Sequence, residues 1–141
     1  MTIPARILVD SSVWIWYLRG DDRPQARLLD DLLAGRHGPA VDVSTTGLVV
    51  TEVLQGLRSD RQFREVRERL ADLPSIDLAD IDFVNAADLY RRARKAGATP
   101  RSTIDLLLAA LCARTGSALL HDDRDFAVIE ELAGLEVVEA G

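Results

Sequence analysis

The chain has 141 residues, which is enough for one domain with a substantial core and too few for two ordinary ones. Hydrophobic residues make up 48% and charged residues 28%, a composition that excludes a wholly disordered or fibrous protein. The formal net charge of −6, from 17 Lys and Arg against 23 Asp and Glu, excludes a protein that holds nucleic acid on a broad basic surface. We therefore expect a single domain over residues 1–141.

No apolar run approaches the length of a membrane span, and Asp10 interrupts the first apolar stretch before a signal-peptide core could form. We therefore expect a cytoplasmic protein with no membrane contact. The single Cys112 excludes an internal disulfide framework. Its setting among leucines and alanines predicts a small core residue rather than a nucleophile.

The first predicted element is a buried strand that ends on an acid. The apolar run over 7–9 is typical of a strand covered on both faces, and Asp10 follows it directly. In open α/β sheets the carboxyl end of a strand is where ligands bind. Ser12 is a natural N-cap for a short helix over 13–18 that ends near Gly20.

Helices and strands then alternate through the middle of the chain. Leucines at helical spacing predict a helix over 25–34, and 41–45 is a short strand with β-branched residues. A helix over 47–57 carries Glu52. A further amphipathic helix before the helix breaker Pro74 is predicted by the apolar stripe of Phe63, Val66, Leu70 and Leu73.

The pattern continues to the end of the chain. Residues 75–78 predict a strand, after which Asp80 caps a helix that ends at Gly97 and carries on one side Phe83, Ala87, Tyr90 and Arg94. The segment 103–115 is apolar almost all round, as expected of a buried central helix. The remaining predictions are a strand over 118–121, a helix to Leu132 and a strand over 135–138. This alternation favours an α/β protein with a mostly parallel sheet flanked by helices.

Four acids stand where a charge is normally avoided, at strand ends or on apolar helices: Asp10, Glu52, Asp105 and Asp123. Each has a structural explanation as a turn residue, a solvent-facing glutamate, a capping-box partner of Ser102, or an N-cap shared with Asp122. Taken singly, we favour these explanations for all except Asp10. These structural roles give no reason, however, for all four acids to converge at one edge of the sheet. If they do converge, the repulsion between their carboxylates calls for a hard divalent cation to neutralise it. The pattern predicts a site for one or two Mg²⁺ or Mn²⁺ ions, which could activate water and stabilise a phosphodiester.

Four segments in this order resemble the successive motifs of PIN-domain proteins, and more narrowly of VapC-type toxins: Val-Asp-Ser-Ser-Val-Trp-Ile, Thr-Glu-Val-Leu-Gln-Gly-Leu, Ile-Asp-Leu-Leu-Leu-Ala-Ala and Asp-Asp-Arg-Asp-Phe. The resemblance covers essentially the whole chain. It implies a PIN-like three-layer α/β/α fold with a central sheet of 4–5 strands. It also implies the toxin of a type II toxin–antitoxin system, a homodimer held inactive by a cognate antitoxin.

The same resemblance implies a metal-dependent endoribonuclease that hydrolyses RNA. Asp10 and Asp105 would be the principal ligands of Mg²⁺, with Mn²⁺ as the alternative ion. Glu52 and Asp123 would complete the catalytic cluster directly or through metal-bound water, and Ser12 would support Asp10.

Asp122 and Asp125 flank Asp123 and stay open as alternatives for the fourth acid of the cluster. His37 and His121 need no catalytic role, and we expect His121 to be structural. The aromatic residues Trp14, Trp16 and Tyr17 are candidates for contacts to RNA bases or to a partner, with core packing as the more common role.

The densest basic segment precedes Asp105 and comprises Arg91, Arg92, Arg94, Lys95 and Arg101. It is a candidate guide for a phosphate backbone, with Arg91, Arg92 and Arg101 as the proposed RNA contacts. A solvated helix face is the alternative.

Other functions fit the acids less well. A phosphotransfer receiver needs a lysine after a late strand, but the only lysine, Lys95, falls in a predicted helix. A haloacid-dehalogenase-like phosphatase needs a second aspartate where this chain has Ser12. A non-toxin PIN nuclease and a catalytically inert PIN-like protein-interaction module remain the alternatives, although the presence of all four acids argues against the inert module.

Overall fold

A parallel sheet of three strands lies at the centre of the computed structural model, which describes residues 3–140 apart from the side chain of Asp125. The strands are β1 (Arg6–Val9), β2 (Asp42–Ser44) and β3 (Ala118–Leu120). Their order is β2-β1-β3, so β1 is central and both neighbours run parallel to it. All three carboxyl ends therefore meet at one edge of the sheet.

The described sheet has fewer full strands than the four or five expected. Residues 75–78 and 135–138, both predicted as strands, each contribute one isolated parallel bridge, through Ser75 to Thr45 and through Val137 to Leu119. The bridge at Ser75 lies just beyond the end of β2. It consists of two hydrogen bonds, from the Thr45 amide to the Pro74 carbonyl and from the Ile76 amide to the Thr45 carbonyl. Such short contacts extend the sheet locally without forming strands of their own.

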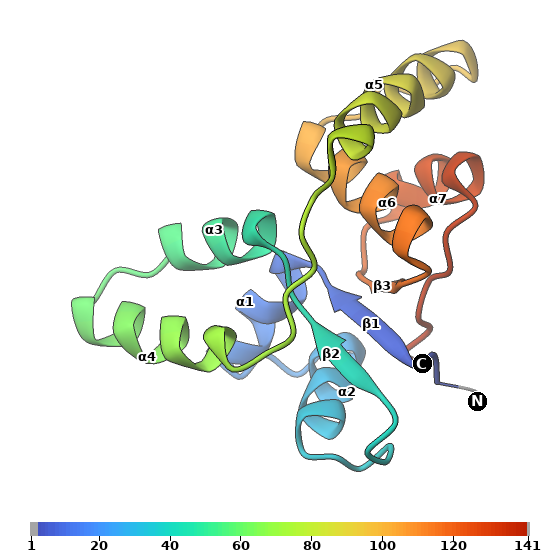
Figure 1. Cartoon of the computed structure of the whole chain (residues 1–141). Coiled ribbons are helices and arrows are strands. Elements are labelled where there is room, and N and C mark those ends of the chain that lie inside the picture. The colour runs from blue at the N-terminus through green and yellow to red at the C-terminus, as the bar shows by residue number, and fades with distance from the viewer. Residues whose placement is uncertain (1–2, 141) are drawn as a thin grey trace.

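Helices cover the sheet on both sides, as expected for a three-layer α/β/α arrangement. The described residues form α1 (Ser11–Arg19), α2 (Pro24–Leu33), α3 (Gly47–Gln55), α4 (Asp60–Ala71), α5 (Asp80–Lys95), α6 (Thr103–Thr115), a 3₁₀ helix η1 (Arg124–Phe126) and α7 (Ala127–Ala133). Figure 1 shows α5, α6 and α7 grouped on one side of the sheet and the first four helices gathered on the other. Within the described part of the chain, no helix is long and apolar enough to cross a membrane.

Two predicted helix starts are wrong by one or two residues. The N-cap of α1 is Asp10 rather than Ser12, because the helix begins directly at the end of β1. The N-cap of α5 is Ala79 rather than Asp80, and the Ala79 amide donates to a carboxylate oxygen of Asp82 at 2.8 Å. The acid that caps the start of α5 is therefore Asp82, the third residue of the helix, which is the position of the acid in a capping box.

The core is built around β1, β3 and α6. The apolar residues of β1 and all of β3 are inaccessible to solvent, and α6 buries an unbroken run from Leu106 to Cys112. Burial raises the pKa of the Cys112 thiol to about 12, which confirms a core residue and excludes a reactive thiolate. Because each large buried side chain stabilises the fold by about 1.5–3 kcal/mol, α6 is firmly anchored, and Asp105 in its first turn is held with it.

Helix α5 has an unusual distribution of polar and apolar residues. Its buried side consists of Ala86, Leu89, Ala93 and the carboxylate of Asp82, while Phe83 and Tyr90 of the predicted stripe are 52% and 43% exposed. A buried charge is tolerated only when it is paired and hydrogen-bonded. The partner comes from the far end of α6.

That partner is Arg114. Its Nε donates to Asp82 Oδ1 at 2.8 Å, and its second nitrogen donates to Asp82 Oδ2 at 2.9 Å and to the Asp77 carbonyl at 3.1 Å. The guanidinium holds the pKa of the Asp82 carboxyl below its usual value. This bidentate pair ties the start of α5 to the end of α6, the helix whose first turn carries Asp105.

Candidate metal centre

Asp10 lies where the central strand meets the first helix. Its amide donates to the Leu120 carbonyl at the end of β3, at 3.0 Å, so the chain after β1 stays tied to the neighbouring strand. Its carbonyl accepts from the amides of Val13 and Trp14, which form the first turn of α1. The backbone of Asp10 is thus held by two elements while its carboxylate stays partly accessible at the carboxyl edge of the sheet.

Two consecutive serines at the start of α1 brace two acids. Ser12 Oγ donates to Asp10 Oδ2 at 2.5 Å, and Ser11 Oγ donates to Glu52 Oε1 at 3.1 Å. Glu52 belongs to α3, so the turn after β1 orients one carboxylate of its own and one from a helix 41 residues away. Ser11 was not among the predicted site residues, because only the tertiary structure shows which acid faces its hydroxyl.

Asp105 lies in the first turn of α6, and the hydroxyl of Ser102 caps that helix. The cap bond uses the Asp105 amide, which donates to Ser102 Oγ at 3.4 Å. The structural explanation as a helix cap therefore accounts for the backbone of Asp105. The cap bond does not involve the Asp105 carboxylate, whose surroundings are a separate question.

The neighbours of the Asp105 carboxylate are the other three predicted acids. Burial and, in decreasing order, the negative charges of Asp10, Asp123 and Glu52 together raise the pKa of the Asp105 carboxyl to about 7. Burial also raises the pKa of Glu52, opposed by the hydrogen bond from Ser11 and assisted by the charge of Asp10. The structure thus brings Asp10, Glu52 and Asp123 close enough to Asp105 to disfavour its ionisation.

The burial of Asp105 and the nearby negative charges predict that the Asp105→Asn variant is more stable than the natural chain when no metal is present. Below about pH 4 the carboxyl is protonated both folded and unfolded, so the two proteins should be equally stable. Between about pH 4 and pH 7 the folded state binds a proton that the unfolded state has released, so the stability of the natural chain falls as the pH rises. At pH 8 we expect an advantage of about 1–2 kcal/mol for the variant.

Urea unfolding of both proteins with a chelator, from pH 5 to pH 8, measures this difference. The free energy gap should widen up to about pH 7 and then stay level. A gap that is constant over this range would contradict an electrostatic origin, since a packing effect of the amide does not titrate.

The fourth acid lies in the loop between β3 and α7. Asp123 is exposed, its carbonyl accepts from the Phe126 amide to form η1, and its own amide donates to His121 Nδ1 at 3.0 Å. Asp122 is also exposed, and the side chain of Asp125 lies outside the described residues. Of the two loop acids with described side chains, Asp122 and Asp123, it is Asp123 whose charge raises the pKa of Asp105.

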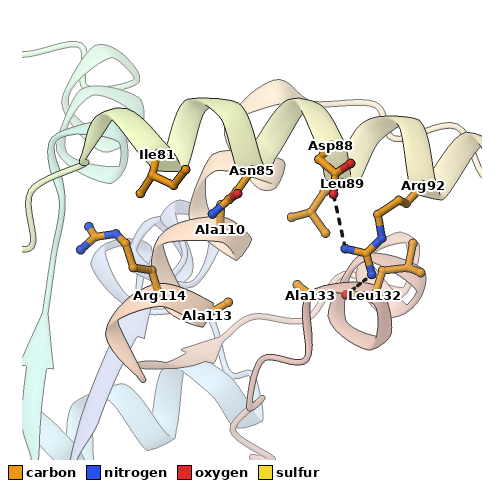
Figure 2. A pocket seen from close by; sticks show the side chains of 10 residues that line it. All are labelled: Ile81, Asn85, Asp88, Leu89, Arg92, Ala110, Ala113, Arg114, Leu132 and Ala133. Carbon is orange, nitrogen blue, oxygen red and sulfur yellow. Dashed lines mark hydrogen bonds and ion pairs between the residues drawn. The ribbon is translucent and has the colours of Figure 1, made fainter.

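The three arginines proposed as RNA contacts come from α5 and from the loop that precedes α6. Arg91 lines an apolar groove of about 480 Å³ between α5 and α6. Arg92 points toward a separate cavity of about 380 Å³ between α5, α6 and α7, where it donates to the Leu132 carbonyl at 2.8 Å (Figure 2). Arg101 is exposed in the loop that precedes α6. Arg91 and Arg92, although adjacent in the sequence, therefore line different cavities.

The aromatic residues of α1 divide between the core and the surface. Trp14 is buried and packs edge-on against the partly buried Tyr17, with ring centroids 6.0 Å apart. The guanidinium carbon of Arg23 lies 4.0 Å from the centroid of the partly buried Trp16 ring. His37 is exposed in the loop after α2. Of these residues, Trp16 and Tyr17 keep some accessible surface for a ligand.

The four acids fit a hard divalent cation by the chemistry of their donors. All are carboxylates, which suit Mg²⁺ and Mn²⁺, and the charges that raise the pKa of Asp105 are the kind that a cation would neutralise. Within the described residues, no group of three or more Asp, Glu, His or Cys side chains is arranged to hold a metal ion as it stands. Mg²⁺ keeps several waters and needs only one or two direct carboxylates, so a cluster of this looser kind suits it.

Comparison with known proteins gives one consistent answer. The family model for the PIN domain matches residues 7–132. Ribonuclease VapC11 of Mycobacterium tuberculosis is 36% identical over 131 residues, which cover 92% of this chain and 96% of that protein.

Two solved structures share the fold. VapBC2 from Rickettsia felis, bound to a DNA fragment from its promoter, has a TM-score of 0.72 at 13% identity and covers 94% of this chain and 97% of that one. VapBC-5, a toxin–antitoxin system from Mycobacterium tuberculosis, has a TM-score of 0.67 at 21% identity, with coverage of 96% and 99%.

Proposed function

The chain belongs to the PIN domain family, and within it to the VapC ribonucleases, and we propose that it is the toxin of a type II toxin–antitoxin system. In this proposal it is a Mg²⁺-dependent endoribonuclease, with Mn²⁺ as an alternative ion, and a cognate antitoxin inhibits it. The observation that carries the proposal is the electrostatic cluster of Asp10, Glu52, Asp105 and Asp123 at the carboxyl edge of a parallel sheet.

Each acid has a distinct part in the proposed site. Asp10 and Asp105 are the proposed principal metal ligands: Asp10 directly follows the central strand, and Asp105 lies in the first turn of the most deeply buried helix. Glu52 and Asp123 complete the cluster directly or through water. A divalent cation bound there would lower the pKa of a water molecule and stabilise negative charge on the phosphodiester.

The surrounding side chains keep these acids in place. Ser12 orients the Asp10 carboxylate, and the hydrogen bond from Ser11 favours the ionised form of Glu52 against its burial. The Ser11 hydroxyl thus favours the charged form of Glu52, which is the form that a cation binds. Because ligands held within about 0.5 Å of their working positions are the most effective, this bracing is a functional contribution of the turn after β1.

RNA is the proposed substrate, in line with the ribonuclease that this chain resembles at 36% identity. Arg91 and Arg101 are the proposed contacts to the phosphate backbone, and Arg92 would first have to release the Leu132 carbonyl to join them. The antitoxin is proposed from the solved toxin–antitoxin complexes that share the fold, and a toxin homodimer from the family resemblance. The cytoplasm is the proposed site of action, because cellular RNA is found there.

Metal dependence is the direct test of this function. The purified chain should cleave RNA with Mg²⁺, should lose all cleavage in a chelator, and should recover it when Mn²⁺ is added in excess. Cleavage that survives chelation would contradict the proposal. A folded chain that binds no divalent ion and cleaves no RNA would indicate an inert interaction module, whereas cleavage without growth arrest in cells would indicate a non-toxin nuclease.

A further inference from the structure

The loop that carries Asp123 is connected to the core through one buried histidine. His121 directly follows β3, and its residue is only 9% exposed, although Asp122, Asp123 and Arg124 after it are exposed. Its ring lies 4.8 Å from the ring of the buried Phe126, centroid to centroid. The histidine is therefore an anchor for an otherwise exposed segment.

Both ring nitrogens of His121 are hydrogen-bonded. Nδ1 lies 3.0 Å from the backbone nitrogen of Asp123 and accepts its proton, so Nδ1 itself carries none. The ring proton is then on Nε2, which donates to the Glu130 carboxylate of α7. These two bonds define one tautomer and one orientation of the ring, as in the outer partners that orient metal-binding residues.

We propose that His121 is the positioning residue of the fourth acid: it holds the backbone of Asp123 through Nδ1 and is itself held to α7 by Glu130. This inference rests on the proposed function of Asp123 in the metal cluster. The sequence predicted only a structural histidine, and core packing alone would explain its burial and its contact with Phe126. Core packing does not explain an acceptor nitrogen aimed at the amide of the acid that shifts the pKa of Asp105.

The position of the acid matters because an exposed loop residue cannot rely on packing of its own side chain. The amide of Asp123 is tied to His121, and its carbonyl accepts from Phe126 at 3.1 Å. The backbone of Asp123 is thus held at its amide by His121 and at its carbonyl by Phe126, and the rings of these two residues are in contact. Loss of the Nδ1 bond would free the loop at the acid while leaving η1 in place.

Two conservative variants separate the two ring nitrogens. In His121→Asn the amide oxygen takes the place of Nδ1, so the bond to Asp123 survives and the bond to Glu130 is lost. In His121→Gln the amide reaches the place of Nε2, so the reverse holds. Both variants lose ring packing, which means that destabilisation alone does not distinguish them.

The test measures Mn²⁺ affinity by calorimetry, and the exchange of the Asp123 amide proton with solvent by NMR, on the full chain. We expect His121→Gln to weaken Mn²⁺ binding by about 10-fold to 100-fold and to expose the Asp123 amide. His121→Asn should keep both close to the natural values. Equal metal binding by the two variants, or an unprotected Asp123 amide in the natural chain, would overturn the assignment.

Glu130 provides a matched pair of controls on one helix. Glu130→Gln should weaken Mn²⁺ binding less than His121→Gln, since it loosens the ring without removing the Nδ1 acceptor. Glu131→Gln removes a neighbouring exposed carboxylate of α7 and should change neither readout. If the natural chain itself binds no Mn²⁺, the proposed function fails, and the amide exchange of the two His121 variants then decides alone whether this histidine holds Asp123.

Discussion

Replacing Asp10 with Asn is expected to lower RNA cleavage by about 10³-fold, because a metal ligand that contributes several kcal/mol to charge stabilisation is removed. The fold should survive, since the backbone bonds of Asp10 to Leu120, Val13 and Trp14 do not involve its carboxylate. The Asn oxygen can also still accept from Ser12. The substitution thus removes charge at the cluster with little change in shape.

Single-turnover cleavage of one RNA by both proteins measures the effect, with growth arrest in cells as a second readout. Asp72→Asn, at the exposed C-cap of α4, is the control for loss of one negative charge and should cleave normally. Cleavage by the Asp10 variant within a few-fold of the natural rate would place the chemistry elsewhere. A variant that fails to fold, detected by circular dichroism, would be replaced by Asp105→Asn, which is expected to be the more stable protein and equally inactive.

The second large effect concerns stability: Arg114→Ala is expected to lower the free energy of unfolding by about 3 kcal/mol. Within the described residues, the substitution leaves the inaccessible carboxylate of Asp82 with the Ala79 amide as its remaining donor. Removing one partner of a buried pair leaves an uncompensated charge, which is far more destabilising than the loss of a surface ion pair.

Arg92→Ala is the matched control, because Arg92 stands on the opposite wall of the cavity in Figure 2 and its nearest carboxylate, Asp88, is exposed. Its loss should change the free energy of unfolding by less than about 1 kcal/mol. In the double variant Asp82→Asn with Arg114→Ala, part of the stability should return, since no charge is left buried.

The effect of Arg114 should also depend on pH with a defined sign. The guanidinium holds the pKa of Asp82 below its unfolded value, so the pair stabilises the protein above about pH 4 and loses this contribution as the pH falls further. The deficit of Arg114→Ala should therefore shrink on acidification, as measured by urea unfolding at successive pH values. A deficit that stays constant below pH 4 would show that Arg114 acts by packing alone.

Much of the fold follows from local signals in the sequence. The apolar run of β1, the leucine spacing of α2 and the all-round apolar surface of α6 each reflect neighbours within one element, and all three elements form. The glycines after α1 and α6 adopt positive φ at the helix ends, as helix C-caps favour. The positions of Asp10 and Asp123 after β1 and β3 could be anticipated to lie near each other, because parallel strands share their carboxyl edge.

The pairing of polar groups could not be anticipated in this way. Asp82 and Arg114 are 32 residues apart, and Ser11 and Glu52 are 41 apart, so no local pattern links either pair. The sequence pointed to the exposed side of α5 through Phe83 and Tyr90, whereas the buried side contains Asp82. Likewise, His121 could be expected in the core, but not its bond to the Asp123 amide.

The sequence by itself determined the succession of strands and helices and the set of acids at one edge of the sheet, because both depend on the chemistry and spacing of residues within single elements. Only the tertiary structure decided which hydroxyl, guanidinium or imidazole meets each of those acids. Such partners are chosen when elements pack against one another, and a buried or half-buried charge is stable only where that packing supplies a donor.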